Sequence, residues 1–185
     1  MEYLHIDDDL HLEKIKETHA PLVFEIIQRD RNYLRQWLPF IDQTRNLKDT
    51  EKYFRLILSP QHGNQNELYT IWYRGELAGL AGFKEIDNVN HKSEIGYWLS
   101  EKFQGKGIMT KTVRKMIDFG FRNLKMNRIQ IKVAVGNNKS SAIPRRIGLS
   151  FEGVERDGEI HTDRYYDLEI FSILKKEWIE SITNI

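Results

Sequence analysis

A glycine-rich segment in the middle of the chain carries the clearest chemical signal. It reads Gln104-Gly105-Lys106-Gly107-Ile108-Met109-Thr110 and lies between a β-rich run and a strongly amphipathic stretch that predicts a helix. Glycine lets consecutive backbone N–H groups converge on one point, and a helix that begins there adds the positive end of its dipole. The segment therefore predicts a binding site for an anion, most simply a phosphate group.

Two common phosphate-binding loops do not fit this segment. The loop of nucleotide hydrolases, Gly-x-x-x-x-Gly-Lys-Ser/Thr, is absent from the chain. The dinucleotide-binding loop, Gly-x-Gly-x-x-Gly, is matched only in part, because Thr110 stands at the third glycine position. The sequence thus disfavours a nucleotide hydrolase and a Rossmann dehydrogenase, and the remaining alternative is that the glycines only make a tight turn.

The segment resembles the pyrophosphate loop of the GNAT superfamily of acetyl-CoA-dependent N-acetyltransferases, which reads Gln/Arg-x-x-Gly-x-Gly/Ala. Residues 104–109 match it except at Met109, where the family usually has Gly or Ala. Residues 137–153 are similar to the family's second block, an Asn-x-x-Ser, a short helix and a Gly-Phe pair, with Leu149 in place of Phe. Two blocks in the right order are far more specific than either alone.

The resemblance extends over nearly the whole chain. Tyr33-Leu-Arg-Gln-Trp-Leu-Pro-Phe40 and Trp178 are similar to the branch that acetylates the N-termini of ribosomal proteins. The resemblance implies an α/β (α+β) GNAT fold over residues 1–185 as a single domain, with a mixed, mostly antiparallel sheet of about seven strands flanked by helices. Hydrophobic patterning predicts strands over 5–15, 68–73, 77–83, 93–99, 128–135 and 165–174, and helices over 18–27, 46–58, 107–124 and 140–148.

The same resemblance assigns the site of acetyl-CoA. Backbone amides of residues 104–110 and the Thr110 hydroxyl would bind the pyrophosphate, and Lys106 or Lys111 would supply positive charge. The strand that carries Trp98 and Leu99 would splay from its neighbour, so that its free backbone groups pair with the pantetheine arm and polarise the thioester.

Asn137 would bond the pantetheine arm near the sulfur, or else only turn the chain before the helix. The implied reaction is direct attack of an amine on acetyl-CoA in a ternary complex. Glu159, between two strands, is the first candidate for the general base, with Glu94 as its rival. Ser140 either gives a proton to the departing thiolate or caps the helix.

Proton energetics bear on the acceptor. At pH 7, deprotonating an α-amine of pKa ~7.7–8.0 costs about 1 kcal/mol, against about 4.6 kcal/mol for a lysine near 10.4. A modest base therefore suffices for the N-terminal α-amine of a protein, in this branch a ribosomal protein. Trp37 and Phe40 are the expected substrate contacts, and the variable loops over 37–46 and 61–67 are expected to set specificity. The alternatives are an acetyltransferase for a small-molecule amine and a non-catalytic acyl-CoA-binding or sensing module, which Met109 would favour.

Composition excludes several other classes. The 185 residues contain no cysteine, which removes disulfides, thiolate nucleophiles and cysteine metal sites, so acetyl-CoA would supply the sulfur. With 28 Lys and Arg against 27 Asp and Glu, the net charge of +1 argues against a broad nucleic-acid surface. The six histidines lack the i, i+4 spacing of a helical metal site, and no metal is expected.

An acidic start and the lack of a run of ~20 apolar residues predict a cytoplasmic protein without membrane contact. Exposed edge strands would allow a homodimer.

Overall fold

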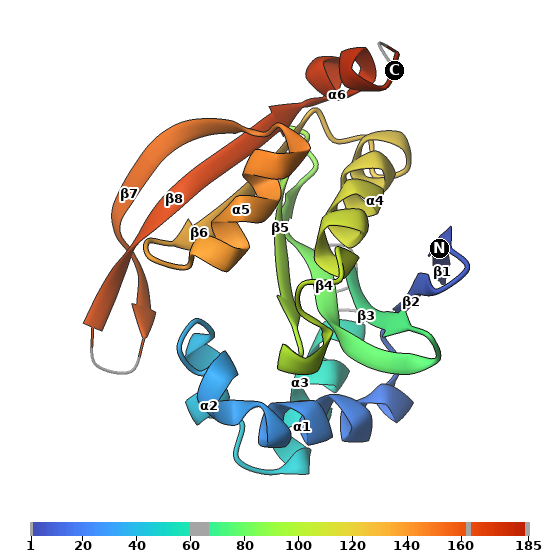
Figure 1. Cartoon of the computed structure of the whole chain (residues 1–185), viewed down its shortest axis with the longest axis vertical. Helices are drawn as coiled ribbons and strands as arrows, with labels where there is room; N and C mark the ends of the chain where they lie inside the picture. The colour runs from blue at the N-terminus through green and yellow to red at the C-terminus, as the bar shows by residue number, and fades with distance from the viewer. Residues whose placement is uncertain (1, 60–66, 162–163, 184–185) are drawn as a thin grey trace.

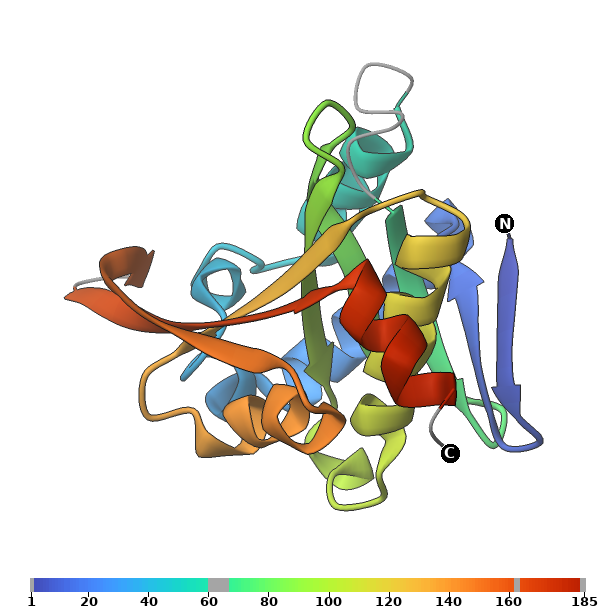
Figure 2. The same cartoon turned by 90° about the horizontal axis from the view of Figure 1, so that it is seen from above.

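One eight-stranded sheet organises the chain (Figures 1 and 2), in the order β1-β2-β3-β4-β5-β6-β8-β7. The structure is a computed structural model that describes residues 2–59, 67–161 and 164–183. The strands are β1 (Tyr3–Asp7), β2 (Leu10–Lys14), β3 (Glu67–Tyr73), β4 (Glu76–Asp87), β5 (Lys92–Leu99), β6 (Arg128–Ala134), β7 (Ser150–His161) and β8 (Arg164–Leu174). All neighbours are antiparallel except β5 and β6, which confirms the predicted mixed, mostly antiparallel sheet.

Helices cover both faces of this sheet (Figure 1). They are α1 (Ala20–Arg29), α2 (Arg31–Leu34), α3 (Leu47–Leu58), α4 (Ile108–Arg122), α5 (Asn138–Ile147) and α6 (Lys175–Thr183), with 3-10 turns η1 (Glu17–His19), η2 (Pro39–Asp42) and η3 (Glu101–Phe103). One buried cluster joins α4, α5 and α6 to one face, and a second joins α1–α3 to the other. Within the described residues, none of the helices combines the length and the apolar character that crossing a membrane requires.

The helices begin and end where local sequence dictates. The helix expected to begin at Asn46 or Asp49 is α3, which begins directly after Asn46, where the Asp49 carboxylate accepts the N–H of Asn46 at 3.0 Å. In α4, Val113 and Met116 are fully buried while Arg114 is exposed, as the amphipathic pattern predicts. Gly148 ends α5 with φ 90°, a conformation that favours glycine.

One predicted element is wrong, and some elements of the fold were not predicted. The single strand expected over 5–15 is the hairpin of β1 and β2, and neither β7 nor α6 was predicted. Strand β7 is hard to see in the sequence because it lies at the sheet edge, where even Val154 and Ile160 are about half exposed. Its pairing with β8 defines it, and Glu159, expected between two strands, lies inside it opposite Tyr166.

An ion pair ties the edge strand β7 to the sheet and predicts how stability depends on pH. Arg128 of β6 donates two hydrogen bonds of 2.6 Å to the Glu152 carboxylate, and the Ser172 hydroxyl of β8 donates a third at 2.7 Å. These donors lower the pKa of Glu152 from 4.5 to about 2. A depressed carboxyl pKa stabilises the fold above the unfolded pKa, and this stabilisation is lost as the pH falls from about 4.5 to 2.

Glu152→Gln should therefore make the free energy of unfolding less dependent on pH below about pH 5. We expect the urea midpoint to fall less between pH 5 and pH 3 in Glu152→Gln than in the wild type, from a lower starting value at pH 5. Chemical denaturation at both pH values measures this. An equal fall in the two proteins would contradict the assignment.

Candidate active site

Strands β5 and β6 separate midway through the sheet. They pair only over residues 92–94 and 128–130, whereas β5 continues to pair with β4 as far as Leu99. Ser100 N–H donates to the Ala78 carbonyl on β4 at 2.8 Å. Backbone groups alternate sides along a strand, so the N–H and C=O groups of Trp98, like those of Ser100, point to β4. Those of Tyr97 and Leu99 point the other way, into the opening. The opening thus offers unpaired backbone groups from two residues.

A large cavity of about 2010 Å³ extends from this opening, lined on one side by α4 and α5 and on the other by α2 and α3. Every residue that the sequence analysis proposed for the site lies on its wall. They are Trp37, Phe40, Glu94, Trp98, Leu99, Gln104, Gly105, Lys106, Gly107, Ile108, Met109, Thr110, Lys111, Asn137, Ser140 and Glu159. The fold therefore brings the two sequence blocks and the aromatic stretch to one place.

The glycine-rich loop has the form of an anion site. Gly105 and Gly107 both have φ 73°, in the left-handed region, and Gly107 is the residue before the first turn of α4. In the described part of the chain, the amide N–H groups of residues 105–110 have no protein acceptor. The side-chain nitrogen of Gln104 is buried and likewise has no acceptor there. A row of free donors at a helix N-terminus is suited to phosphate oxygens.

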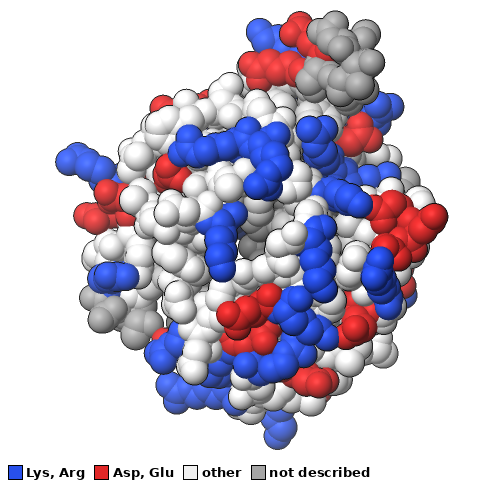
Figure 3. Space-filling model, viewed as in Figure 1, with Lys and Arg blue, Asp and Glu red and all other residues white. Residues whose placement is uncertain are grey.

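Basic side chains gather on the face that carries α4 and α5 (Figure 3). Lys106 lies over the Phe103 ring at 5.3 Å, whereas Lys111 is paired with Asp7 at 2.7 Å and so contributes less charge than expected. Arg146 of α5 donates to the Thr110 hydroxyl at 2.9 Å. Sequence reasoning missed Arg146, because only the packing of α5 beside α4 places it at the loop.

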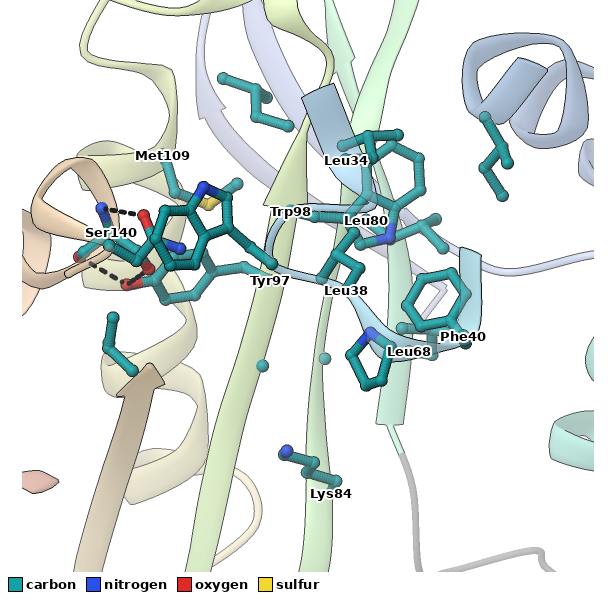
Figure 4. A pocket seen from close by; sticks show the side chains of 18 of the residues that line it. Leu34, Leu38, Phe40, Leu68, Leu80, Lys84, Tyr97, Trp98, Met109 and Ser140 are labelled. Carbon is teal, nitrogen blue, oxygen red and sulfur yellow. Dashed lines mark hydrogen bonds between the residues drawn. The ribbon is translucent and has the colours of Figure 1, made fainter. Parts of the chain in front are cut away.

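Ser140 and Tyr97 form a hydroxyl pair at the opening (Figure 4). The Ser140 hydroxyl donates to the Tyr97 oxygen at 3.3 Å, and Tyr97 donates to the Ser140 carbonyl at 3.1 Å. Burial raises the pKa of Tyr97 to about 12, so its hydroxyl keeps its proton at neutral pH. Asn137 caps α5 by accepting the Ser140 N–H at 3.2 Å, which leaves its amide NH2 as a donor.

Met109 is buried and belongs to the core cluster under α4 (Figure 4). Met109, which stands where the family usually has Gly or Ala, therefore adds an apolar side chain to the core.

The two candidate bases have different surroundings. The Glu94 side chain is only 4% exposed, and its carboxylate pairs with Lys84 at 2.7 Å and accepts from Gln130 at 3.2 Å. The Glu159 side chain is 36% exposed and meets Nε2 of the buried His161 at 2.7 Å through one oxygen. Among the described residues the other oxygen of Glu159 meets no donor, and His161 orients the carboxylate. The spacing of the histidines along the chain gave no signal of this contact. It follows from β7, because side chains two residues apart in a strand face the same side.

The aromatic stretch forms the wall opposite Ser140 (Figure 4). A Cβ on Gly136, one residue before Asn137, would come within 3.8 Å of the Trp37 ring, and Phe40 is 41% exposed. Arg31 donates to the Ile41 carbonyl at 2.6 Å and to that of Thr44, which fixes this segment. Of the predicted specificity loops, residues 61–66 lie outside the described part of the chain. Among described residues, no group of three or more His, Cys, Asp or Glu could hold a metal ion.

Fold and site together define a class of acyl-transfer enzyme, and sequence comparison agrees. The model of the acetyltransferase (GNAT) domain matches residues 9–150, and the chain belongs to this family. It is 35% identical to YdaF of Bacillus subtilis (strain 168), provisionally named a ribosomal N-acetyltransferase, over 94% of this chain and 95% of the relative. It is 26% identical to the ribosomal-protein-serine acetyltransferase of Escherichia coli (strain K12), over 92% and 96%.

Two solved structures show the same arrangement of elements. RimL, a ribosomal L7/L12 alpha-N-protein acetyltransferase in complex with coenzyme A, has a TM-score of 0.88 at 29% identity and covers 94% of this chain and 98% of its own. The microcin C7 self-immunity acetyltransferase MccE, in complex with acetyl-CoA and AMP, has a TM-score of 0.86 at 28% identity, over 91% and 94%. The predicted class, an acetyl-CoA-dependent N-acetyltransferase, is confirmed, and the non-catalytic alternative is disfavoured.

Proposed function

We propose that the chain acetylates the N-terminal α-amine of a protein, most specifically a ribosomal protein, with acetyl-CoA as donor. The observation that carries this proposal is the opening between β5 and β6, which has the glycine-rich loop at one end and Glu159 on its wall. The free amides of residues 105–110 and the buried Gln104 nitrogen fit the pyrophosphate. Both structural neighbours described above contain CoA or acetyl-CoA.

The residues of the opening have separate roles in the proposed reaction. Acetyl-CoA supplies an activated acetyl group and a thiolate leaving group. Glu159 takes the proton from the amine, and the N–H of Leu99 stabilises the negative charge that develops on the carbonyl oxygen. The Asn137 amide holds the pantetheine arm beside Ser140. The Ser140 hydroxyl, which donates to the Tyr97 oxygen in the free protein, rotates to donate its proton to the departing sulfur. A thiol with pKa about 8.5 needs only this modest help.

The acceptor assignment is supported by the chemistry of the base and by the relatives. A single partly exposed carboxylate is adequate for an α-amine, whose deprotonation at pH 7 costs about 1 kcal/mol. Trp37 and Phe40 offer apolar surface for the first residues of a peptide, beside the opening. Two relatives are named for acetylation of ribosomal proteins.

A thiol-release assay tests this function. Purified protein and acetyl-CoA are combined with N-terminal peptides of ribosomal proteins, the same peptides with a blocked α-amine, and a panel of small amines. We expect turnover with the free peptides, none with blocked peptides that keep a lysine, and a lower kcat/KM for small amines. A higher kcat/KM for a small amine would overturn the peptide assignment and retain the enzyme class. No CoA binding by calorimetry would overturn both.

The wider organisation is part of the same proposal. We propose that residues 1–185 form one domain, a view supported by the single sheet that contains all the described strands from β1 to β8. A ribosomal-protein substrate would place the chain in the cytoplasm, and the homodimer stays a prediction.

A further inference from the structure

A buried carboxylate at the end of α1 has no part in the reaction described above. Asp30 is 7% exposed, and it accepts hydrogen bonds from Arg29 Nε at 3.0 Å, Arg29 Nη2 at 3.4 Å and the backbone N–H of Glu101 at 3.0 Å. A buried charge is costly unless donors surround it. The contact with Glu101 joins two segments that lie 71 residues apart in the chain.

Arg29 makes a second link to the same segment. Its Nη2 donates to the hydroxyl of the fully buried Ser100 at 2.8 Å, and Ser100 N–H donates to the Ala78 carbonyl at 2.8 Å. Burial by itself raises the pKa of Asp30, but hydrogen bonds from Arg29, Ser100 and Glu101 outweigh it, and the pKa lies below its usual value. Asp30 is therefore held as a charged acceptor in this network.

The segment so anchored lies between the two parts of the CoA site. Leu99 ends the separated part of β5, Ser100 and Glu101 begin the 3-10 turn, and Gln104 N–H donates back to the Glu101 carbonyl at 3.2 Å. Gly105 follows directly. Figure 1 shows this turn, between β5 and α4, next to α1. The position of residues 100–104 thus sets the distance between the pantetheine-facing backbone and the glycine-rich loop.

Asp30 also holds the first turn of α2, which leads into the aromatic stretch, but it does so with its backbone and not with its carboxylate. Its backbone carbonyl accepts the N–H groups of Tyr33 and Leu34 in α2. A side-chain substitution leaves this carbonyl in place. The two sides of the cavity can therefore be separated experimentally at this one residue.

We propose that Asp30 is a positioning residue for acetyl-CoA: its carboxylate, together with Arg29, fixes residues 100–104 so that the end of β5 and the glycine-rich loop bind one ligand at once. This inference rests on the proposed function, in which residues 105–110 hold the pyrophosphate.

Asp30→Asn is the direct test, with CoA itself as the probe in calorimetry. Asn keeps the shape of the side chain but lacks the negative charge to which Arg29 and the Glu101 N–H donate hydrogen bonds. We expect the Kd for CoA to rise about five- to tenfold, in line with the weakening of a charged hydrogen bond. The KM for acetyl-CoA should rise with it, while the KM for the acceptor peptide stays within about twofold. A purely structural role would raise both KM values or neither.

Two further variants keep the test decisive. Asp118→Asn breaks a comparable Arg–Asp pair, with Arg122 on the surface of α4, and should leave the Kd for CoA unchanged. Ser100→Ala removes only the hydroxyl that accepts a hydrogen bond from Arg29, so it should fold even if Asp30→Asn does not. We expect it, too, to raise the Kd for CoA. This inference alone is overturned if the wild type binds CoA and Asp30→Asn binds it with an unchanged Kd. Where Asp30→Asn does not fold, an unchanged Kd in Ser100→Ala has the same meaning. A wild type that binds no CoA overturns the proposed function as well.

Discussion

Glu159→Gln is expected to lower kcat by about 10²- to 10⁴-fold, the usual contribution of a general base, with the KM for acetyl-CoA within about twofold of wild type. Gln keeps the shape of the side chain and its place on β7 but cannot accept the proton of the amine. The defect should shrink as the pH rises past ~8, because the α-amine then loses its proton to solvent. Steady-state kinetics from pH 6.5 to 9 measures both effects.

Glu94→Gln is the matched comparison, since it changes the rival carboxylate in the same cavity. Glu94 is already bonded to Lys84 and Gln130, so the substitution should lower kcat far less than Glu159→Gln. Thermal unfolding of both variants controls for stability, which Glu94→Gln should reduce more because its carboxylate is buried. A large, pH-sensitive loss of kcat in Glu94→Gln alone would transfer the role of base to Glu94.

The parts of the fold that could be predicted are those whose signal is local. The helix after Gly107 follows from apolar residues at helical spacing, and α3 follows from a possible capping residue, Asn46 or Asp49, ahead of apolar residues. Strand β7 could not be predicted, because an edge strand exposed on most of its length has no apolar alternation. The pairing of β7 with β8 is tertiary information, and so is the turn that splits residues 5–15 into a hairpin.

The candidate site divides in the same way. Gly107, Asn137 and Glu159 could be proposed because they lie in segments that resemble a family, and the cavity brings them together. Tyr97 and Arg146 could not, since their partners are 43 and 36 residues away in the chain. Nothing in their own neighbourhood in the sequence distinguishes them from a core tyrosine and a surface arginine.

Gly79→Ala is expected to be the most destabilising small substitution near the opening. A Cβ at Gly79 would lie 2.2 Å from the Trp98 carbonyl oxygen and 3.0 Å from the Leu99 Cα, closer than the packed backbone allows. Strand β4 must then move away from the end of β5. We expect a loss of about 3 kcal/mol or more, as for severe overpacking, and a Tm lower by about 6–12 °C for a chain of this size.

The same movement should impair binding, because Gly79 pairs with Leu99, whose backbone faces the opening. Below its Tm, Gly79→Ala should therefore bind CoA more weakly than the wild type does. Gly96→Ala is the stability control, since a Cβ there meets only the flexible Lys84 side chain, at 3.6 Å, and should change the unfolding free energy by less than about 1 kcal/mol. Equal Tm values for Gly79→Ala and Gly96→Ala would show that β4 does not hold the end of β5 in place. Such a result would leave residues 100–104 as the element that fixes the opening.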